Sequence, residues 1–134
     1  MRRRLLPWVI AATAVAQAPK PVGTMSQFMI DVIFPASNAV FYVREGPTNE
    51  KEWMDLQYNA FVLGETANLL MAPDRARDKD QWMKDAQLLL DVGLKAYQAA
   101  KKKDVAALQA LNEPLYEACQ SCHVHYRPGY RRRE

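Results

Sequence analysis

The sequence predicts an all-α protein folded as an antiparallel four-helix bundle, and three observations lead to that prediction. Apolar residues recur every three or four positions along most of the chain, which is the period of an amphipathic helix. Strand signals are weak, because the chain has no long alternating run and no Asn-Gly or Asp-Gly pair. Prolines, glycines and capping residues divide the periodic part into four segments with short connections, as in an up-and-down bundle. A looser all-α domain of different topology is the alternative.

The first predicted helix runs from about Thr24 to Arg44. Pro35 lies inside it and should kink or divide it, because proline lacks an N–H and crowds the preceding turn. Gly46 and Pro47 follow its end, which is a common arrangement at a helix stop. Its apolar stripe contains Val22, Met25, Met29, Ile33, Ala36, Val40 and Val43.

The second predicted helix begins at Thr48 or Asn49 and stops before Pro73. Asn49 and Glu52 have the spacing of a capping box, with Asn in place of the usual Ser or Thr. Its apolar residues alternate by three and four in an a/d-type pattern. They are Trp53, Leu56, Ala60, Leu63, Ala67 and Leu70.

The third predicted helix spans about Asp80 to Lys101, and the fourth runs from its cap Asp104 to about Arg127. Pro114 should kink or break the fourth helix. The third stripe contains Trp82, Ala86, Leu89, Leu90, Gly93, Tyr97 and Ala100. The fourth contains Val105, Leu108, Leu111, Leu115, Ala118, Cys122 and Tyr126.

Residues 1–16 have the parts of a cleaved signal peptide: three arginines, an apolar run from Leu5, and Ala-Val-Ala ending at Ala16. We place the cut before Gln17, so residues 17–134 would form one four-helix-bundle domain. The alternative is an uncleaved membrane anchor. A helix over the apolar run would cover only about 18 Å of a hydrocarbon core of roughly 30 Å. We therefore expect an exported, periplasmic protein without stable membrane insertion after cleavage.

The charge balance argues against nucleic acid as a partner. The chain has 18 basic and 15 acidic residues, a formal net charge of +3. Loss of the three leader arginines leaves equal numbers of each sign. The basic residues do not line one helix face, and no nucleic-acid-binding motif accompanies them.

The segment Cys119-Gln120-Ser121-Cys122-His123 is a C-x-x-C-H sequence, the attachment sequence of haem c. Residues three and four apart share a helix face, so Cys119 and Cys122 can form thioethers with the two vinyl groups of one porphyrin. His123 follows at once, and histidine is a standard proximal ligand of haem iron. The motif predicts one covalent haem c, with His123 as iron ligand.

Three other uses of the cysteine pair fit less well. A disulfide across this spacing would close almost no loop and would stabilise little. A thioredoxin-like dithiol needs a βαβ context with the motif at a helix N-terminus, whereas this motif ends the last predicted helix. A zinc site needs a second ligand pair, and His123 and His125 are too close to the cysteines to supply one.

A C-terminal C-x-x-C-H on the fourth helix of a small bundle resembles the class II cytochromes c, the cytochrome c-prime superfamily. The pattern Cys-x-x-Cys-His-x-x-Tyr-Arg is present from Cys119 to Arg127, and Phe28-Met29 with Pro35-Ala36 is similar to the superfamily's first helix. Residues 64–70 add a weak match. The likeness covers roughly the whole mature chain, and the haem motif is its most specific part. It implies a haem between helices, with the first helix over the distal face.

The resemblance leaves the sixth iron position open between two branches. In the low-spin branch, a methionine of the first helix binds the iron, and Met29 best matches that position. Met25, one turn earlier on the same face, is the alternative, and both can instead be core filler. In the high-spin branch, a bulky apolar residue leaves the iron five-coordinate. Arg127 matches the family's proximal arginine near the haem edge or a propionate, and an exposed helix-end cation is its alternative.

These features predict a one-electron carrier rather than an enzyme, with redox proteins as partners. The alternative function is a five-coordinate protein that binds nitric oxide or carbon monoxide. A peroxidase would need a distal acid–base group, and the first helix has no His and only Asp31 as an acid near Met29. His125 should point to another face. The sequence leaves open whether the chain forms a homodimer.

Overall fold

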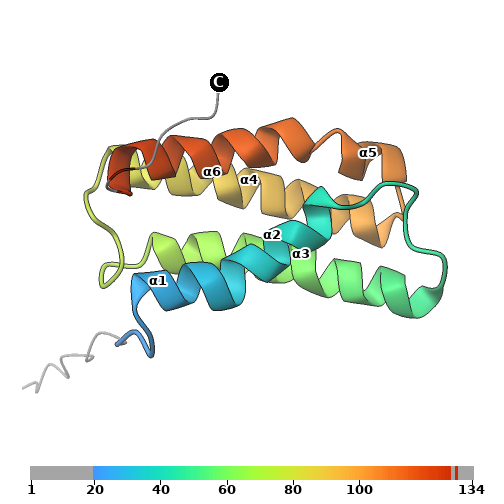
Figure 1. Ribbon diagram of the computed structural model, residues 1–134, viewed down its shortest axis with the longest axis horizontal. Coiled ribbons are helices and arrows are strands. Elements are labelled where there is room, and N and C mark those ends of the chain that lie inside the picture. Colours follow the sequence, from blue (N-terminus) through green and yellow to red (C-terminus); the bar gives the residue numbers. More distant parts are fainter. Residues whose placement is uncertain (1–19, 128, 130–134) are drawn as a thin grey trace, which may run out of the picture.

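The computed structural model describes residues 20–127 and 129, and every regular element in them is a helix. Four helical arms run alternately up and down and pack side by side (Figure 1). The predicted all-α fold with four packed helices is confirmed. The predicted leader, residues 1–16, lies outside the described residues. The elements are α1 (Met25–Phe28), the π-helical turn η1 (Met29–Ile33), α2 (Phe34–Phe41), α3 (Glu50–Leu70), α4 (Gln81–Lys101), α5 (Val105–Gln109) and α6 (Asn112–Tyr126).

The first arm consists of α1, η1 and α2 in direct succession. Pro35 does not end the helix. Instead the turn before it widens, and the Phe34 N–H donates to the carbonyl of Met29, five residues back. A π turn of this kind accommodates a proline that cannot donate to the carbonyl four residues earlier. The arm ends at Phe41, three residues before the predicted Arg44, because the backbone of Tyr42 leaves the helical region.

The second arm, α3, begins where the sequence predicts. The Asn49 side chain accepts a 3.0 Å hydrogen bond from the Glu52 N–H. The reciprocal half of the capping box is shifted by one residue, because the Glu52 carboxylate accepts from the Thr48 N–H at 2.7 Å. All six residues of the predicted stripe are buried.

The third and fourth arms also follow the predicted boundaries closely. The indole N–H of Trp82 donates to the Leu70 carbonyl at 2.6 Å, which ties the start of α4 to the end of α3. The Asp104 side chain caps α5 by accepting from the Ala107 N–H. The predicted break occurs between α5 and α6, and Pro114 lies in the first turn of α6, where no intrahelical N–H is required.

The pairs of neighbouring arms differ in how extensively they pack against each other. The contact between α3 and α4 is the most extensive in the bundle, and that between α2 and α6 is slight. At the α3–α4 crossing, Gly64 and Gly93 let the two backbones approach. A Cβ atom on Gly93 would lie 2.5 Å from the Gly64 Cα atom, closer than real Cβ atoms come to backbone. The bundle therefore has one tight side and one loosely joined seam.

Gly93→Ala is expected to destabilise the protein by about 1–3 kcal/mol, because the new methyl group must push two helix backbones apart. Gly64→Ala is the matched control. Its Cβ would meet the Gly93 carbonyl carbon at 3.6 Å, an ordinary contact. Alanine also favours a helix over glycine by about 1 kcal/mol. Thermal unfolding should show a clear loss for Gly93→Ala only, and equal melting temperatures would contradict the close crossing.

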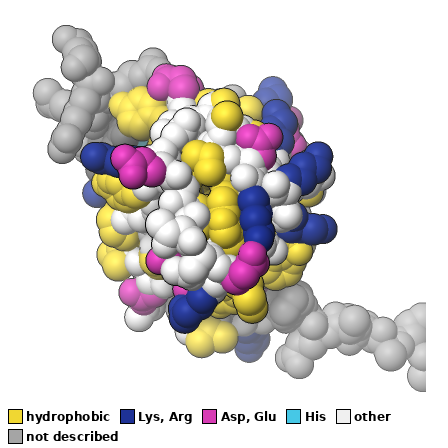
Figure 2. All heavy atoms as spheres, turned by 90° about the vertical axis from the view of Figure 1, so that its right-hand side faces the viewer, with side chains coloured by type: hydrophobic (Ala, Val, Ile, Leu, Met, Phe, Trp, Pro, Cys, Tyr) yellow, Lys and Arg dark blue, Asp and Glu magenta, His cyan; other side chains and the backbone are white. Residues whose placement is uncertain are grey.

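The end of the bundle that carries α5 shows basic and acidic side chains interspersed with apolar ones, without a broad patch of one charge (Figure 2). Lys103 and Glu50 form an ion pair that joins the α4–α5 connection to the start of α3. Within the described ranges, no helix combines the length and the apolar character needed to cross a membrane.

Candidate functional site

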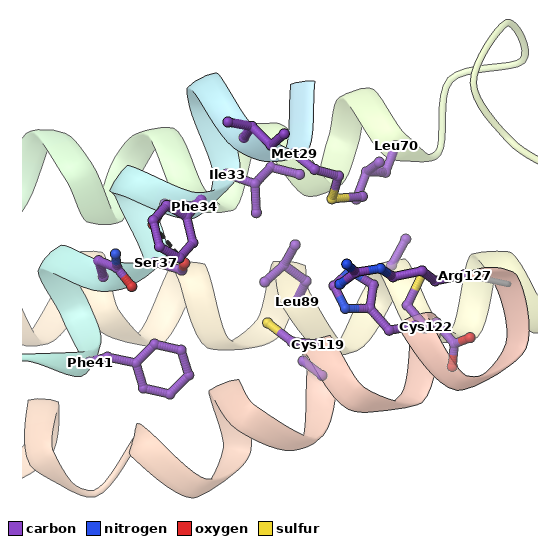
Figure 3. A pocket seen from close by; sticks show the side chains of 16 residues that line it. Met29, Ile33, Phe34, Ser37, Phe41, Leu70, Leu89, Cys119, Cys122 and Arg127 are labelled. Carbon is purple, nitrogen blue, oxygen red and sulfur yellow. Dashed lines mark hydrogen bonds between the residues drawn. The ribbon is translucent and has the colours of Figure 1, made fainter. Parts of the chain in front are cut away.

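A cavity of about 440 Å³ lies along the loosely joined seam, with the first arm on one side and α4 and α6 on the other (Figure 3). This volume is within the range of about 300–1,000 Å³ that ligand pockets occupy. Most of the lining is apolar. The first arm contributes Met29, Ile30, Ile33, Phe34, Ser37, Asn38 and Phe41. The other walls comprise Leu70, Asp85, Ala86, Leu89, Ala118, Cys119, Cys122, His123 and Arg127.

The structure brings the two cysteines and the histidine of the C-x-x-C-H motif to this one cavity. Cys119, Cys122 and His123 lie in the last two turns of α6 and line the same wall. The labelled cysteines project from α6 toward the first arm in Figure 3. The spacing explains this, because positions three and four apart in a helix share a face.

The cysteine thiols are free and half-buried. Burial raises the pKa of Cys119 to about 11. The pKa of Cys122 is also raised to about 11. Burial is the larger cause, and the negative charge of Asp85 is the second. Both thiols are therefore neutral at pH 7. A redox dithiol instead needs a lowered pKa, commonly at a helix N-terminus, and these residues lie near the C-terminus of α6.

The imidazole of His123 is held in its neutral form at pH 7. Burial, and then the positive charge of Arg127, lower the pKa of His123 below its usual value. A neutral imidazole has one unprotonated ring nitrogen, which is the form that binds a metal. Both the position and the charge state of His123 therefore suit an iron ligand.

Of the two candidate methionines, Met29 lines the cavity and Met25 does not. Met25 packs against the hydrophobic core one turn earlier. Met29 is the first residue of the π turn, and its side chain reaches the cavity from the wall opposite Cys119 (Figure 3). Ile30 and Phe34 line the same wall and are 64% and 61% exposed, so this wall reaches the surface.

No protein-family model, no curated protein and no solved structure matches this chain.

Arg127 also lines the cavity, directly after the last residue of α6. Its backbone N–H donates to the His123 carbonyl at 3.0 Å, which keeps the end of the helix regular next to the motif. Its side chain is exposed and lies close enough to His123 to affect the pKa of that residue. A cation at the mouth of an apolar cavity suits a ligand that carries carboxylates.

The sequence prediction missed Asp85. This residue is 1% exposed, lines the cavity, and accepts hydrogen bonds from Gln81 (3.0 Å) and from the Ser121 hydroxyl (2.5 Å). Nδ1 of His125 lies 3.0 Å from its other oxygen. One signal was present, because Asp85 lies between Trp82 and Leu89 on the apolar face of its helix. Buried carboxylates are rare unless they are paired.

His125 is exposed and does not line the cavity, in agreement with the prediction that it lies on another face of the helix than His123. The partner of His125 is Asp85. The aromatic residues that the sequence assigns to packing or to haem contact do pack: Trp53 and Trp82 are buried, and the half-buried Tyr97 meets the Phe61 ring edge-on. Trp82 makes a similar edge contact with Tyr126.

Proposed function

We propose that this chain is a small exported c-type cytochrome that carries single electrons. One haem c would be attached through thioethers to Cys119 and Cys122, with His123 as axial ligand of the iron. The observation that carries the proposal is that these three residues line one largely apolar cavity between the first arm and α6. Such a cavity suits the two apolar faces of a porphyrin.

The residues around the cavity fit this group. The half-buried, neutral thiols line the cavity in which the thioethers would form, and the neutral imidazole of His123 can bind iron. Arg127 offers a cation for a propionate at the cavity mouth. The bound haem iron supplies one-electron exchange between Fe(II) and Fe(III). The protein's part is to hold the iron ligands in place and to keep water from the apolar walls.

The sixth ligand that we propose is Met29. It lines the wall opposite the motif, whereas Met25 lies outside the lining. A thioether ligand favours Fe(II) and so raises the potential. The same ligands in both oxidation states also mean little rearrangement during electron transfer.

The second candidate function is a five-coordinate protein that binds nitric oxide or carbon monoxide. The observation in its favour is the bulk of Ile33 and Phe34 beside Met29, since such side chains can cover the distal face without binding iron. Asp31 is exposed and is not part of the cavity lining. The resemblance to the class II cytochromes c agrees with either function.

The covalent bond is tested by acidic organic extraction of the full chain, expressed together with a c-type haem maturation system. Haem is expected to stay on the wild-type chain, as seen in the mass of the intact protein. Cys119→Ala/Cys122→Ala should lose it completely, because no thioether can form. Each single variant is the control and should keep haem through one bond. Free extraction from the wild type would overturn the proposal.

A further inference from the structure

Beside the cavity, the third and fourth arms are joined by a partly buried polar cluster centred on Asp85. Asp85 of α4 is almost fully enclosed, and two of its partners, Ser121 and His125, belong to α6. A carboxylate can only accept hydrogen bonds, so we assign the proton of His125 to Nδ1. The third partner, Gln81, belongs to α4 itself and does not connect the helices.

The two α6 partners of Asp85 lie on one face of that helix, because they are four residues apart. The residues that line the cavity, Cys119, Cys122 and His123, lie on the adjoining face. The same rotation of α6 that brings Ser121 and His125 to Asp85 therefore turns Cys119, Cys122 and His123 to the cavity.

Few large apolar side chains hold the rotation of α6. Its fully buried apolar residues are Leu115 and the small Ala118, and Tyr126 packs edge-on against Trp82 at the end of the helix. The helix packs mainly on α4 and has little contact with α2.

Hydrophobic contact is non-directional. Hydrogen bonds to a buried carboxylate are directional. A rotation of α6 would break the bonds from Ser121 and His125 to Asp85, and leaving the enclosed carboxylate without these donors costs free energy. Tyr126 adds a hydrogen bond to Asp78, but at the exposed end of the helix.

We infer that Asp85 is a positioning residue: through Ser121 and His125 it fixes the rotation of α6, so that both cysteines and His123 face the cavity. Its relevance to haem attachment rests on the proposed function. Asp85 does not itself bind the cofactor in this assignment.

Four variants of the full chain test this inference. Asp85→Leu removes the carboxylate but keeps its bulk, and Ser121→Ala/His125→Ala removes the α6 partners while leaving Asp85 in place. Gln81→Ala is the control, since it takes one hydrogen bond from the carboxylate without touching α6. Asp85→Asn is the conservative replacement, because its amide oxygen can still accept from Ser121.

The first measurement is the alkylation rate of Cys119 in chains made without haem, below the melting temperature of the haem-free wild type. Cys122 is not used, because the charge of Asp85 raises its pKa, so that loss of this charge alone would speed its alkylation. Asp85→Leu and Ser121→Ala/His125→Ala should each raise the rate at least about tenfold, because each removes both α6 hydrogen bonds to the carboxylate and the loss of one such bond already has about this effect. Gln81→Ala should match the wild type, and Asp85→Asn should fall nearer to it than to Asp85→Leu. Unchanged rates in Ser121→Ala/His125→Ala would overturn the inference, because the effect of Asp85→Leu would then come from core packing.

The second measurement is made on chains matured with haem. The fraction with two thioethers should fall in the two disrupting variants, and the ferric magnetic-resonance spectrum should show more than one species. Replacing a buried charge with an apolar group often leaves the melting temperature unchanged or raises it. Asp85→Leu should lower the fraction with two thioethers even in that case. Full, homogeneous attachment in both variants would overturn the inference. If the alkylation rates change as expected but the wild type carries no haem, the rotation of α6 is supported and the proposed function fails.

Discussion

Met29→Leu is expected to turn a low-spin ferric protein into a high-spin one, because leucine keeps the bulk but removes the sulfur that binds iron. The reduction potential should fall by on the order of 0.1 V, since axial ligands set haem potentials over about 0.8 V. Carbon monoxide should bind slowly or weakly to the wild type, in which it must displace the sulfur, and readily to Met29→Leu. Absorption, magnetic resonance and redox titration of the purified protein measure these effects.

Met25→Leu is the matched control for this substitution. Met25 lies one turn earlier, packs against the core and does not line the cavity, so its replacement should leave the spectrum low-spin. A low-spin spectrum that survives Met29→Leu but collapses in Met25→Leu would keep the carrier function and correct the ligand. A five-coordinate, high-spin wild type would reject both methionines and favour binding of nitric oxide or carbon monoxide.

The haem-free chain is expected to melt at least about 10 °C below the haem-bound protein and to have poorly fixed packing around the cavity. Removing the ligand leaves a largely apolar space of about 440 Å³ between the first arm and α6. At about 24 cal/mol per Å³, filling even a quarter of it contributes about 3 kcal/mol. A change of 1 kcal/mol shifts the melting temperature of a domain of roughly 100 residues by about 4–8 °C.

Thermal unfolding and near-ultraviolet circular dichroism compare the two forms. Cys119→Ala/Cys122→Ala made without haem is the control, because it cannot form a disulfide that would restrain the unfolded chain. It should melt like the haem-free wild type. Equal melting of the haem-bound and haem-free forms would mean that nothing fills the cavity.

Most of the fold was predictable because it depends on local interactions. The caps Asn49 and Asp104 each bond to an N–H three residues later, and Pro114 acts on its own turn. The apolar periodicity identified most of the buried residues for the same reason, since positions three and four apart share a face. It was wrong for Val22, which precedes the first helix and is fully exposed, and it missed the buried Phe28. The attachment motif was equally visible, because Cys119 to Cys122 is a single turn of helix.

The sequence by itself therefore determined the helical class, the boundaries of most helices and the C-x-x-C-H motif from which haem attachment is proposed. Only the tertiary structure decided which methionine lines the cavity, where the bundle is loosely joined, and that Asp85 connects α4 to the motif helix. Asp85 and Ser121 are 36 residues apart in the chain. No local spacing encodes such a contact, because it exists only once two helices have packed and removed the carboxylate from water.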